Sequence, residues 1–373
     1  MKKVVIVQYQ LPHYRVVFFE CLREELSRVG VELTLYYSAE NSIAAIPGSI
    51  SWAHPVKAHL IWKLVWIPVF FRVVGADAVI MGSESKHVLN YQLYALSACS
   101  KLKVGLWGHG KNFQAANQDV IGERIKRHFS KRVDWWFAYN NYSAEIIHSL
   151  GFDESRITSV QNSIDTRGIS KARAAIEEKD LRRLKEELGI DSDNVAVFTG
   201  RFFRVKRTEF LMKACEAIRQ RIPDFHMILI GSGPEQHFVD EATAKHRWIH
   251  AVGVKNDVEK APYWMISKLL LMPGALGLVV LDTFVFGTPM VTTRVTGHGP
   301  EVSYLESGRN GLIVDSDPED VVGYADEVAR LMLSADRLQV MRENCFKDAS
   351  RYSVENMASR FAKGVAEMLD ISS

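Results

Sequence analysis

Residues 269–301 constrain the fold more than any other stretch of the chain. An apolar run at 269–272 ends in a Pro-Gly pair, and Gly277 then opens an apolar, helix-like segment that closes at Gly287. Backbone N–H groups at a helix N-terminus lack partners within the helix and carry partial positive charge. A strand, a glycine turn and a helix start therefore predict an anion site, with an ordinary tight crossover as the alternative.

Length and composition indicate a two-domain globular protein. The chain has 373 residues, of which 47% are hydrophobic and 24% charged, and domains of about 150–200 residues are expected at this size. No apolar run reaches the ~20 residues that span a bilayer, and the N-terminus lacks the pattern of a signal peptide, so we expect a cytoplasmic protein. The cysteines show no CxxC pair and are expected to be buried free thiols: Cys21, Cys99, Cys215 and Cys345.

Charge divides the chain into two halves. Residues 1–175 contain 21 Lys and Arg against 14 Asp and Glu, whereas residues 176–373 contain 25 against 30. A basic half followed by an acidic half predicts two domains with different partners.

The pattern of the first half predicts a parallel α/β domain. Short β-branched or apolar runs alternate with helical stretches, which is typical of strands joined by helical crossovers. No GxGxxG follows the first run, and this argues against a dinucleotide-binding dehydrogenase. The predicted strands are residues 3–8, 31–37, 78–81, 103–107, 135–139 and 157–160.

Residues 59–74 are unusually aromatic. They include Trp62 and Trp66 and are interrupted by Lys63 and Arg72. The stretch is too short and too charged to span a membrane, and it predicts an interfacial helix that dips into lipid headgroups. A buried helix of the first domain, or an interdomain contact, is the alternative.

Residues 124–132 form a basic cluster with six Lys, Arg and His residues, among them Arg124, Lys126 and Arg127. Such a cluster would attract anionic phospholipid or an acceptor that carries pyrophosphate. A solvated basic face is the alternative.

The second half repeats one pattern, in which a buried strand ends in a glycine loop. The strand at 195–199 is followed by residues 200–207, which hold four cations, and this loop precedes a helix. Strands at 226–230 and 249–252 also end in glycine turns. Because the carboxyl ends of parallel strands form the ligand-binding edge of such sheets, the four cations predict an anionic ligand.

The order of these motifs resembles the nucleotide-sugar half of glycosyltransferase family 4, whose members are retaining enzymes with the GT-B fold. The resemblance is strong over about residues 195–330 and weaker upstream. The motifs are GRxxxxK at 200–206, GSGPE at 231–235, GLVVLDTFVFGTPMV at 277–291, Gly297 with Glu301, and GRNGLIV at 308–314.

The resemblance implies roles for the phosphate-binding residues. Arg201 and Lys206 resemble the pair that grips the donor diphosphate and stabilises the departing nucleotide, since cations in a dry cleft stabilise charge that develops on a leaving group. Gly277 and Leu278 resemble the backbone N–H donors to the same phosphates. Asp282 stands where the family has the second glutamate of a paired motif, which binds ribose. Gly200, Gly231, Val254 and Lys255 complete the implied nucleotide site.

The implied sugar site departs from the family. The first glutamate of the paired motif should stand at position 274, where this chain has Gly274. His109 lies between two glycines and resembles the first-domain histidine that reaches the donor sugar, with a catalytic role. The remaining implied contacts to the sugar are Ala275, Leu276 and Glu301, with His298 as a weaker candidate.

The acceptor is expected on the first domain. Its predicted contacts are the loop after the first strand together with the aromatic and basic stretches. The loop residues are Pro12, His13, Tyr14 and Arg15.

The resemblance implies a GT-B α/β fold with two Rossmann-like, doubly wound parallel-sheet domains that face each other across a cleft. A C-terminal helix is expected to cross back to the first domain. The predicted parts are an acceptor domain at 1–170, a linker helix and hinge at 171–194, a nucleotide-sugar domain at 195–352 and the returning helix at 353–373.

The predicted function is retaining transfer of a sugar from a UDP or GDP sugar to a glycan or lipid-linked acceptor in bacterial surface polysaccharide synthesis. We expect this at the inner face of the membrane, in contact with anionic lipid. No nucleic acid partner and no cofactor are expected. No metal is expected because the Asp-x-Asp triplets at 191–193 and 315–317 look like turns or helix starts. A nucleotide-sugar epimerase with the same fold and a catalytically silent donor-binding partner are the alternatives.

Overall fold

The chain forms two compact units. The structure, a computed structural model, describes all residues except 39–49, 63, 85, 111–130 and 372–373. The first unit comprises Met1–Asp165 and Val354–Ser373, and the second comprises Thr166–Ser353. The stretch predicted as a linker, 171–194, thus falls within the second unit. No described helix has the length and apolar character needed to cross a bilayer.

The first unit is built on a parallel sheet, as the sequence predicted. Its order is β3-β2-β1-β6-β7-β8-β9, and apolar side chains on its two faces form two separate cores. The strands are β1 (Lys2–Gln8), β2 (Val31–Ser38), β3 (His54–Val56), β6 (Ala78–Gly82), β7 (Lys103–Gly108), β8 (Trp135–Ala138) and β9 (Ile157–Ser159). The connecting helices include α1 (Val16–Arg28), α3 (Val88–Ala98) and α5 (Asn141–Ser149).

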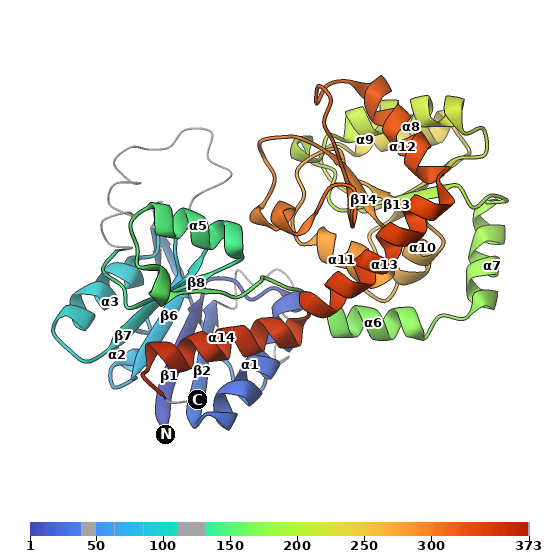
Figure 1. Cartoon of the computed structure of the whole chain (residues 1–373). Coiled ribbons are helices and arrows are strands. Elements are labelled where there is room, and N and C mark those ends of the chain that lie inside the picture. Colours follow the sequence, from blue (N-terminus) through green and yellow to red (C-terminus); the bar gives the residue numbers. More distant parts are fainter. Residues whose placement is uncertain (39–49, 63, 85, 111–130, 372–373) are drawn as a thin grey trace. The chain divides into compact units, whose positions relative to one another are not determined.

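The last helix of the chain, α14 (Val354–Met368), is part of the first unit (Figure 1). It packs along α1, and its Phe361 is fully buried and stacks on Phe137 of β8 with ring centroids 4.1 Å apart. An aromatic pair of this kind contributes packing beyond its buried area. The C-terminal helix is therefore a component of the first hydrophobic core.

The prediction of an interfacial helix at 59–74 is wrong. The stretch forms an antiparallel pair, β4 (His59–Ile61) and β5 (Leu64–Trp66), followed by the short helix α2 (Phe70–Val73). Trp62 lies at the turn with φ of 59°, and the backbone N–H of Val65 donates to the carbonyl of Lys86 at 2.8 Å. β-branched and aromatic residues favour strands, and Pro68 disfavours a helix across the whole stretch.

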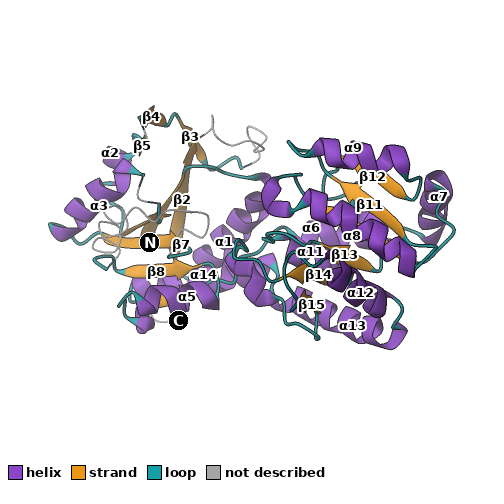
Figure 2. Cartoon of the chain, turned by 90° about the horizontal axis from the view of Figure 1, so that it is seen from above, coloured by secondary structure: helices purple, strands orange, loops and turns teal. Residues whose placement is uncertain are grey.

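The second unit contains a six-stranded parallel sheet of order β12-β11-β10-β13-β14-β15 (Figure 2). The strands are β10 (Val195–Thr199), β11 (His226–Ile230), β12 (Ile249–Gly253), β13 (Leu269–Leu271), β14 (Met290–Thr293) and β15 (Gly311–Val314). The direction of winding changes between β10 and β13, and ligands of such sheets bind at the carboxyl ends of strands beside this switch point.

The helices of the second unit follow the predicted crossovers with one difference. The single charged helix predicted at 171–188 is two helices, because Glu177 caps the second one in a reciprocal capping box with Asp180. The helices are α6 (Thr166–Ala174), α7 (Glu178–Leu188), α8 (Thr208–Arg221), α9 (Gln236–Lys245), α10 (Ala261–Met265), α11 (Val279–Phe286), α12 (Val321–Met332) and α13 (Ala335–Arg351).

Candidate functional site

The loops after β10 and β11 pack backbone against backbone at the ligand-binding edge of the second sheet. The N–H of Phe202 donates to the carbonyl of Ser232 at 3.1 Å. Gly231 has φ of 144°, and a Cβ there would lie 1.9 Å from the carbonyl oxygen of Gly200. A side chain at this position would therefore force the two loops apart, which explains the glycine in GSGPE.

The four cations of residues 200–207 have different environments. Arg207 adopts φ of 59°, donates to Thr293 Oγ1 at 3.1 Å and pairs with Glu319 at 2.9 Å, so its charge is already compensated. Arg201 and Arg204 are exposed, and the Arg201 guanidinium lies 4.4 Å from the ring centroid of Phe203. Arg207 is thus a structural residue, whereas Arg201 is accessible to a ligand.

Lys206 is the largely buried cation of this loop. Its amine donates to the carbonyl of Ala275, on the loop after β13, at 2.5 Å. Burial lowers the pKa of Lys206 to about 8. A neutral carbonyl compensates a buried ammonium less well than an anion would, so this position is suited to an anionic ligand.

Gly274 allows the basic loop to approach β13 closely. A Cβ at Gly274 would lie 2.4 Å from the carbonyl oxygen of Val205 and 2.6 Å from Cα of Lys206. The N–H of Ala275 also donates to the Val205 carbonyl at 2.7 Å. The backbone of the basic loop therefore lies where the glutamate of the paired motif would begin, and no acidic side chain fits at position 274 in this arrangement.

His298 links the loops after β13 and β14. Its Nδ1 accepts the N–H of Leu276 at 3.2 Å, and its Nε2 lies 2.8 Å from the carbonyl of Thr293. The carbonyl can only accept, so Nε2 carries the proton and the ring is neutral. Burial lowers the pKa of His298, which favours this neutral form. The histidine is a bridge between loops, and the Leu276 N–H is already used.

Gly277 and Leu278 present backbone N–H groups at the start of α11. Within the described part of the chain, neither N–H takes part in a backbone or side-chain hydrogen bond. No heavy atom lies within 4 Å of where a Cβ of Gly277 would be. The two N–H groups thus lie at the positive end of α11, beside the switch point, without a hydrogen bond among the described residues, and there is open space on the Cβ side of Gly277.

The Asp282 carboxylate, within α11, is buried in an ion pair. Its side chain is only 7% exposed and lies 2.6 Å from Nζ of Lys260, which also pairs with Asp257 at 2.6 Å. Burial alone would lower the pKa of Lys260, but the two carboxylates outweigh it and raise the pKa. Ribose binding by Asp282 stays a prediction, and a ribose would have to share this carboxylate with Lys260.

The other predicted donor contacts occupy varied positions. Val254 is 70% exposed and Lys255 is half-buried on the loop after β12, whereas Glu301 is buried in a short 3-10 helix at 300–304. His109 belongs to the first unit, where it follows β7 and packs edge-to-face on Tyr139 with ring centroids 4.1 Å apart. Donor binding by these residues stays a prediction.

Arg15 does not belong to an exposed acceptor surface. The side chain is buried, its guanidinium donates to the Asn162 side chain and the Ser163 carbonyl, and it lies 5.0 Å from the ring centroid of Trp107. These contacts lie within the first unit and bury the guanidinium, and acceptor binding by Arg15 stays a prediction.

The neighbours of Arg15 and the two tryptophans are more accessible. Pro12 and Tyr14 are half-buried, His13 is exposed, Trp66 is half-buried beside His59, and Trp62 is 95% exposed. The remaining predicted acceptor contacts, Arg124, Lys126 and Arg127, lie outside the described residues.

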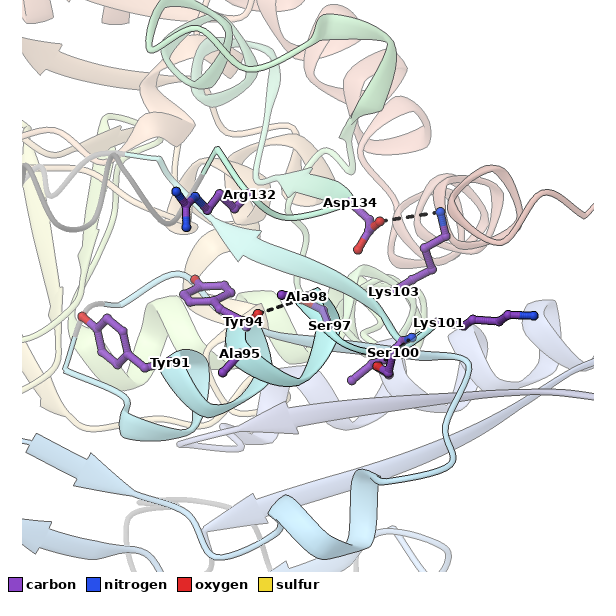
Figure 3. Close-up of a pocket in the computed structure, with 11 residues that line it drawn as sticks. Tyr91, Tyr94, Ala95, Ser97, Ala98, Ser100, Lys101, Lys103, Arg132 and Asp134 are labelled. Carbon is purple, nitrogen blue, oxygen red and sulfur yellow. Dashed lines mark hydrogen bonds and ion pairs between the residues drawn. The ribbon is translucent and has the colours of Figure 1, made fainter.

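A cavity of about 760 Å³ lies in the first unit, between the end of α3 and the starts of β7 and β8. Figure 3 shows Tyr91 and Tyr94 on one side of it, Arg132 on another, and the ion pair of Lys103 with Asp134, whose charged atoms are 3.6 Å apart. This is the amino end of the strands, opposite to the edge that binds ligands in parallel sheets. The cavity is therefore separate from the predicted reaction site.

Three contacts at the site have no signal in the sequence. Lys260 pairs with Asp282 across 22 positions, and Arg207 reaches Thr293 and Glu319 across still longer separations. Each pair joins residues of different elements or loops, so neither helical nor strand periodicity connects them. Only knowledge of the strand order could have predicted that these residues lie close together.

Comparison with known proteins finds similarity to sugar-transferring proteins over part of the chain. Residues 193–334, less than half of the chain, match the family model of Glycosyl transferases group 1. A D-inositol 3-phosphate glycosyltransferase of Corynebacterium urealyticum is 28% identical over 50% of this chain and 46% of its own length. An N-acetyl-alpha-D-glucosaminyl L-malate synthase of Bacillus anthracis is 26% identical over 62% of this chain and 59% of its own length. The chain spans about half the length of the curated relatives it matches.

Solved structures establish the fold. Anabaena HepE in complex with UDP aligns with a TM-score of 0.74 at 16% identity, over 98% of this chain and 100% of that chain. A UDP-N-acetylglucosamine 2-epimerase from Listeria monocytogenes, described as putative in its title, aligns with a TM-score of 0.66 at 13% identity, over 100% and 98%. The chain therefore has the GT-B fold of two Rossmann-like domains, which confirms the fold predicted from the sequence.

The close approach at Gly274 gives a stability prediction. Gly274→Glu should destabilise the second unit by about 1–3 kcal/mol, because the new Cβ would overlap the backbone at 205–206. Gly277→Ala is the matched control, since its Cβ meets no atom within 4 Å. Thermal unfolding measures both variants, and equal midpoints for the two would contradict the described contact.

The burial of Lys206 gives a pH prediction. Below pH 8 the lysine is charged in both folded and unfolded chains, so the penalty for burying it is complete; between about 8 and 10.5 the unfolded chain binds more protons and the wild type gains stability. Lys206→Met should therefore stabilise the second unit at pH 7, on the order of 2 kcal/mol after solvent screening. The gain should shrink as the pH rises toward 10.5.

Urea unfolding at pH 7 and at higher pH measures this effect. Lys213→Met is the control, because Lys213 is exposed on α8 and pairs with Glu209. A gain from Lys206→Met that is the same at both pH values would argue that the lost charge is not the cause.

Proposed function

We propose that this protein is a glycosyltransferase that moves a sugar from a UDP or GDP sugar to an acceptor. One observation carries the proposal: the largely buried Lys206 amine, with a neutral carbonyl as partner, and the N–H groups of Gly277 and Leu278, which make no hydrogen bond among the described residues, lie together beside the switch point of the second sheet. A diphosphate has the charge and the acceptor atoms for both. The match of residues 193–334 to Glycosyl transferases group 1 supports this assignment.

In the proposed reaction, the bond between the anomeric carbon and the phosphate oxygen breaks, and negative charge grows on the departing diphosphate. Lys206 would stabilise that charge from a site with little water, where electrostatic interactions are stronger than in bulk solvent. Arg201, which is exposed on the same loop, would bind the outer phosphate with its planar guanidinium. Because these cations neutralise the diphosphate, we propose that transfer needs no metal.

We further propose that transfer retains the anomeric configuration, with front-face attack and the leaving phosphate as base. The retaining enzymes of glycosyltransferase family 4, which the motifs of residues 195–330 resemble, support this. The proposed acceptor is a glycan or lipid-linked sugar of a bacterial surface polysaccharide, used at the inner face of the cell membrane. The names of the relatives refer to inositol 3-phosphate and malate. Small hydroxylated anions should therefore be tested as acceptors alongside the glycan or lipid-linked sugar.

Each of the two alternative functions has one observation that supports it. The epimerase alternative is supported by the fold shared with the Listeria protein. The silent donor-binding alternative is supported by Gly274, which leaves no room for the expected acidic residue.

Diphosphate binding is the first experimental test. Calorimetric titration with UDP, GDP and ADP should detect micromolar binding of one nucleotide, and Arg201→Ala and Lys206→Ala should each weaken it by about 1.5–3 kcal/mol. Arg330→Ala is the control, because Arg330 pairs with Glu327 on α12 and carries the same charge. Absence of binding, or equal affinities in all variants, would remove the basis of the donor site.

Product analysis tests the reaction itself. Incubation of the wild type with UDP or GDP sugars in EDTA should release nucleoside diphosphate slowly, and faster with an acceptor, and proton NMR should show a product of unchanged anomeric configuration. A reversible change in the sugar of the donor without release of nucleotide would instead identify an epimerase. Binding without any turnover would identify a silent partner protein.

A further inference from the structure

The hairpin β4–β5 and the adjoining helix α2 expose an unusual amount of apolar surface. Of the fourteen large apolar side chains that are exposed among the described residues, six lie within residues 60–74. Figure 2 shows β4, β5 and α2 together at one margin of the first unit. Exposed fractions are 70% for Leu60, 53% for Ile61, 95% for Trp62, 46% for Leu64, 89% for Phe71 and 55% for Val74.

Buried residues attach the hairpin and α2 to the core of the first unit. Val65 is 2% exposed and belongs to the core of the first unit, and its N–H bonds to the carbonyl of Lys86. Val73 of α2 is fully buried in the same core. Trp62 sits at the turn with positive φ, which is uncommon for a bulky residue. Val65 and Val73 thus attach β5 and α2 to the core beside the exposed side chains.

Charge along this stretch favours an anionic partner. Residues 50–76 contain no Asp or Glu, whereas Lys57 and Arg72 are exposed on either side of the hairpin. Contiguous apolar surface of this kind marks an interaction site. Trp and Phe together with flanking cations are the residues that bind at the interface between lipid headgroups and acyl chains.

We propose that the β4–β5 hairpin and the exposed side of α2 dock the first unit on an anionic lipid bilayer. Trp62, Leu60 and Phe71 would enter the headgroup region, and Lys57 and Arg72 would face lipid phosphates. The segment is a short hairpin, so it lies in the interface and does not cross it. This surface deepens the proposed function, on whose membrane location it rests, but the binding itself needs no nucleotide or acceptor.

Vesicle co-sedimentation of the full chain tests the proposal. The wild type should bind phosphatidylcholine vesicles that contain phosphatidylglycerol, and more weakly those that do not. The variant Leu60→Ser/Trp62→Ser should bind at least about tenfold more weakly, because it removes two apolar side chains from the interface. The control Leu333→Ser/Val340→Ser alters two exposed apolar residues of the second unit and should bind like the wild type.

Circular dichroism and nucleotide titration of each variant establish that it is folded. Quenching of tryptophan fluorescence by brominated lipid should fall in Trp62→Phe if Trp62 enters the bilayer. Failure of the wild type to bind acceptor-free vesicles, or equal binding by the hairpin variant, would overturn the proposal. So would self-association that depends on Leu60 and Trp62 without vesicle binding, since it would identify a second copy of the chain as the partner.

Discussion

The burial of one charge, the Lys206 ammonium, is the constraint on which the geometry of the second unit depends. The amine reaches a backbone carbonyl of the neighbouring loop, and that carbonyl is its sole partner among the hydrogen bonds and ion pairs of the described residues. A lysine in water would carry no such desolvation cost, so the burial of this ammonium is unfavourable with a neutral carbonyl as its partner. Such a cost in folding free energy is tolerated where many other contacts fix the surrounding backbone. Here the glycine loops of β10 and β11, the Arg207 contacts and the His298 bridge fix the neighbouring backbone.

The sequence predicted those parts of the fold in which local chemistry and global topology agree. Strands that end in glycine loops gave the parallel sheets, and Gly277 does border open space at a helix start. The returning helix α14 lies in the first core, which a resemblance could suggest but periodicity could not. The prediction of a helix at 59–74 failed because aromatic, β-branched residues fit both a membrane-facing helix and a hairpin. In the structure, the antiparallel pairing of β4 with β5 and the bond from Val65 to the Lys86 carbonyl identify the hairpin.

The site was less predictable than the fold because its charges are sorted by tertiary contacts. The charge pattern of residues 200–207 does not distinguish its four cations, and only the resemblance singled out Arg201 and Lys206. In the structure Arg207 is neutralised, Lys206 is buried, and Arg201 and Arg204 are in solvent. Asp282 likewise looked like a free carboxylate, yet Lys260 pairs with it from a different crossover. Whether a charged side chain can bind a ligand depends on ion-pair partners that are distant in sequence. No local sequence pattern predicts these partners.

The contact at Gly274 also couples two segments that are distant in the sequence. The backbone of residues 205–206 occupies the volume into which any side chain at 274 would extend. A glutamate at 274 would meet this backbone before it could reach a sugar. A carboxylate at this position would require the basic loop to change its course at the same time. Position 274 and the path of the basic loop therefore cannot be redesigned separately: an engineered acidic residue at 274 needs a rebuilt loop at 205–206 with it.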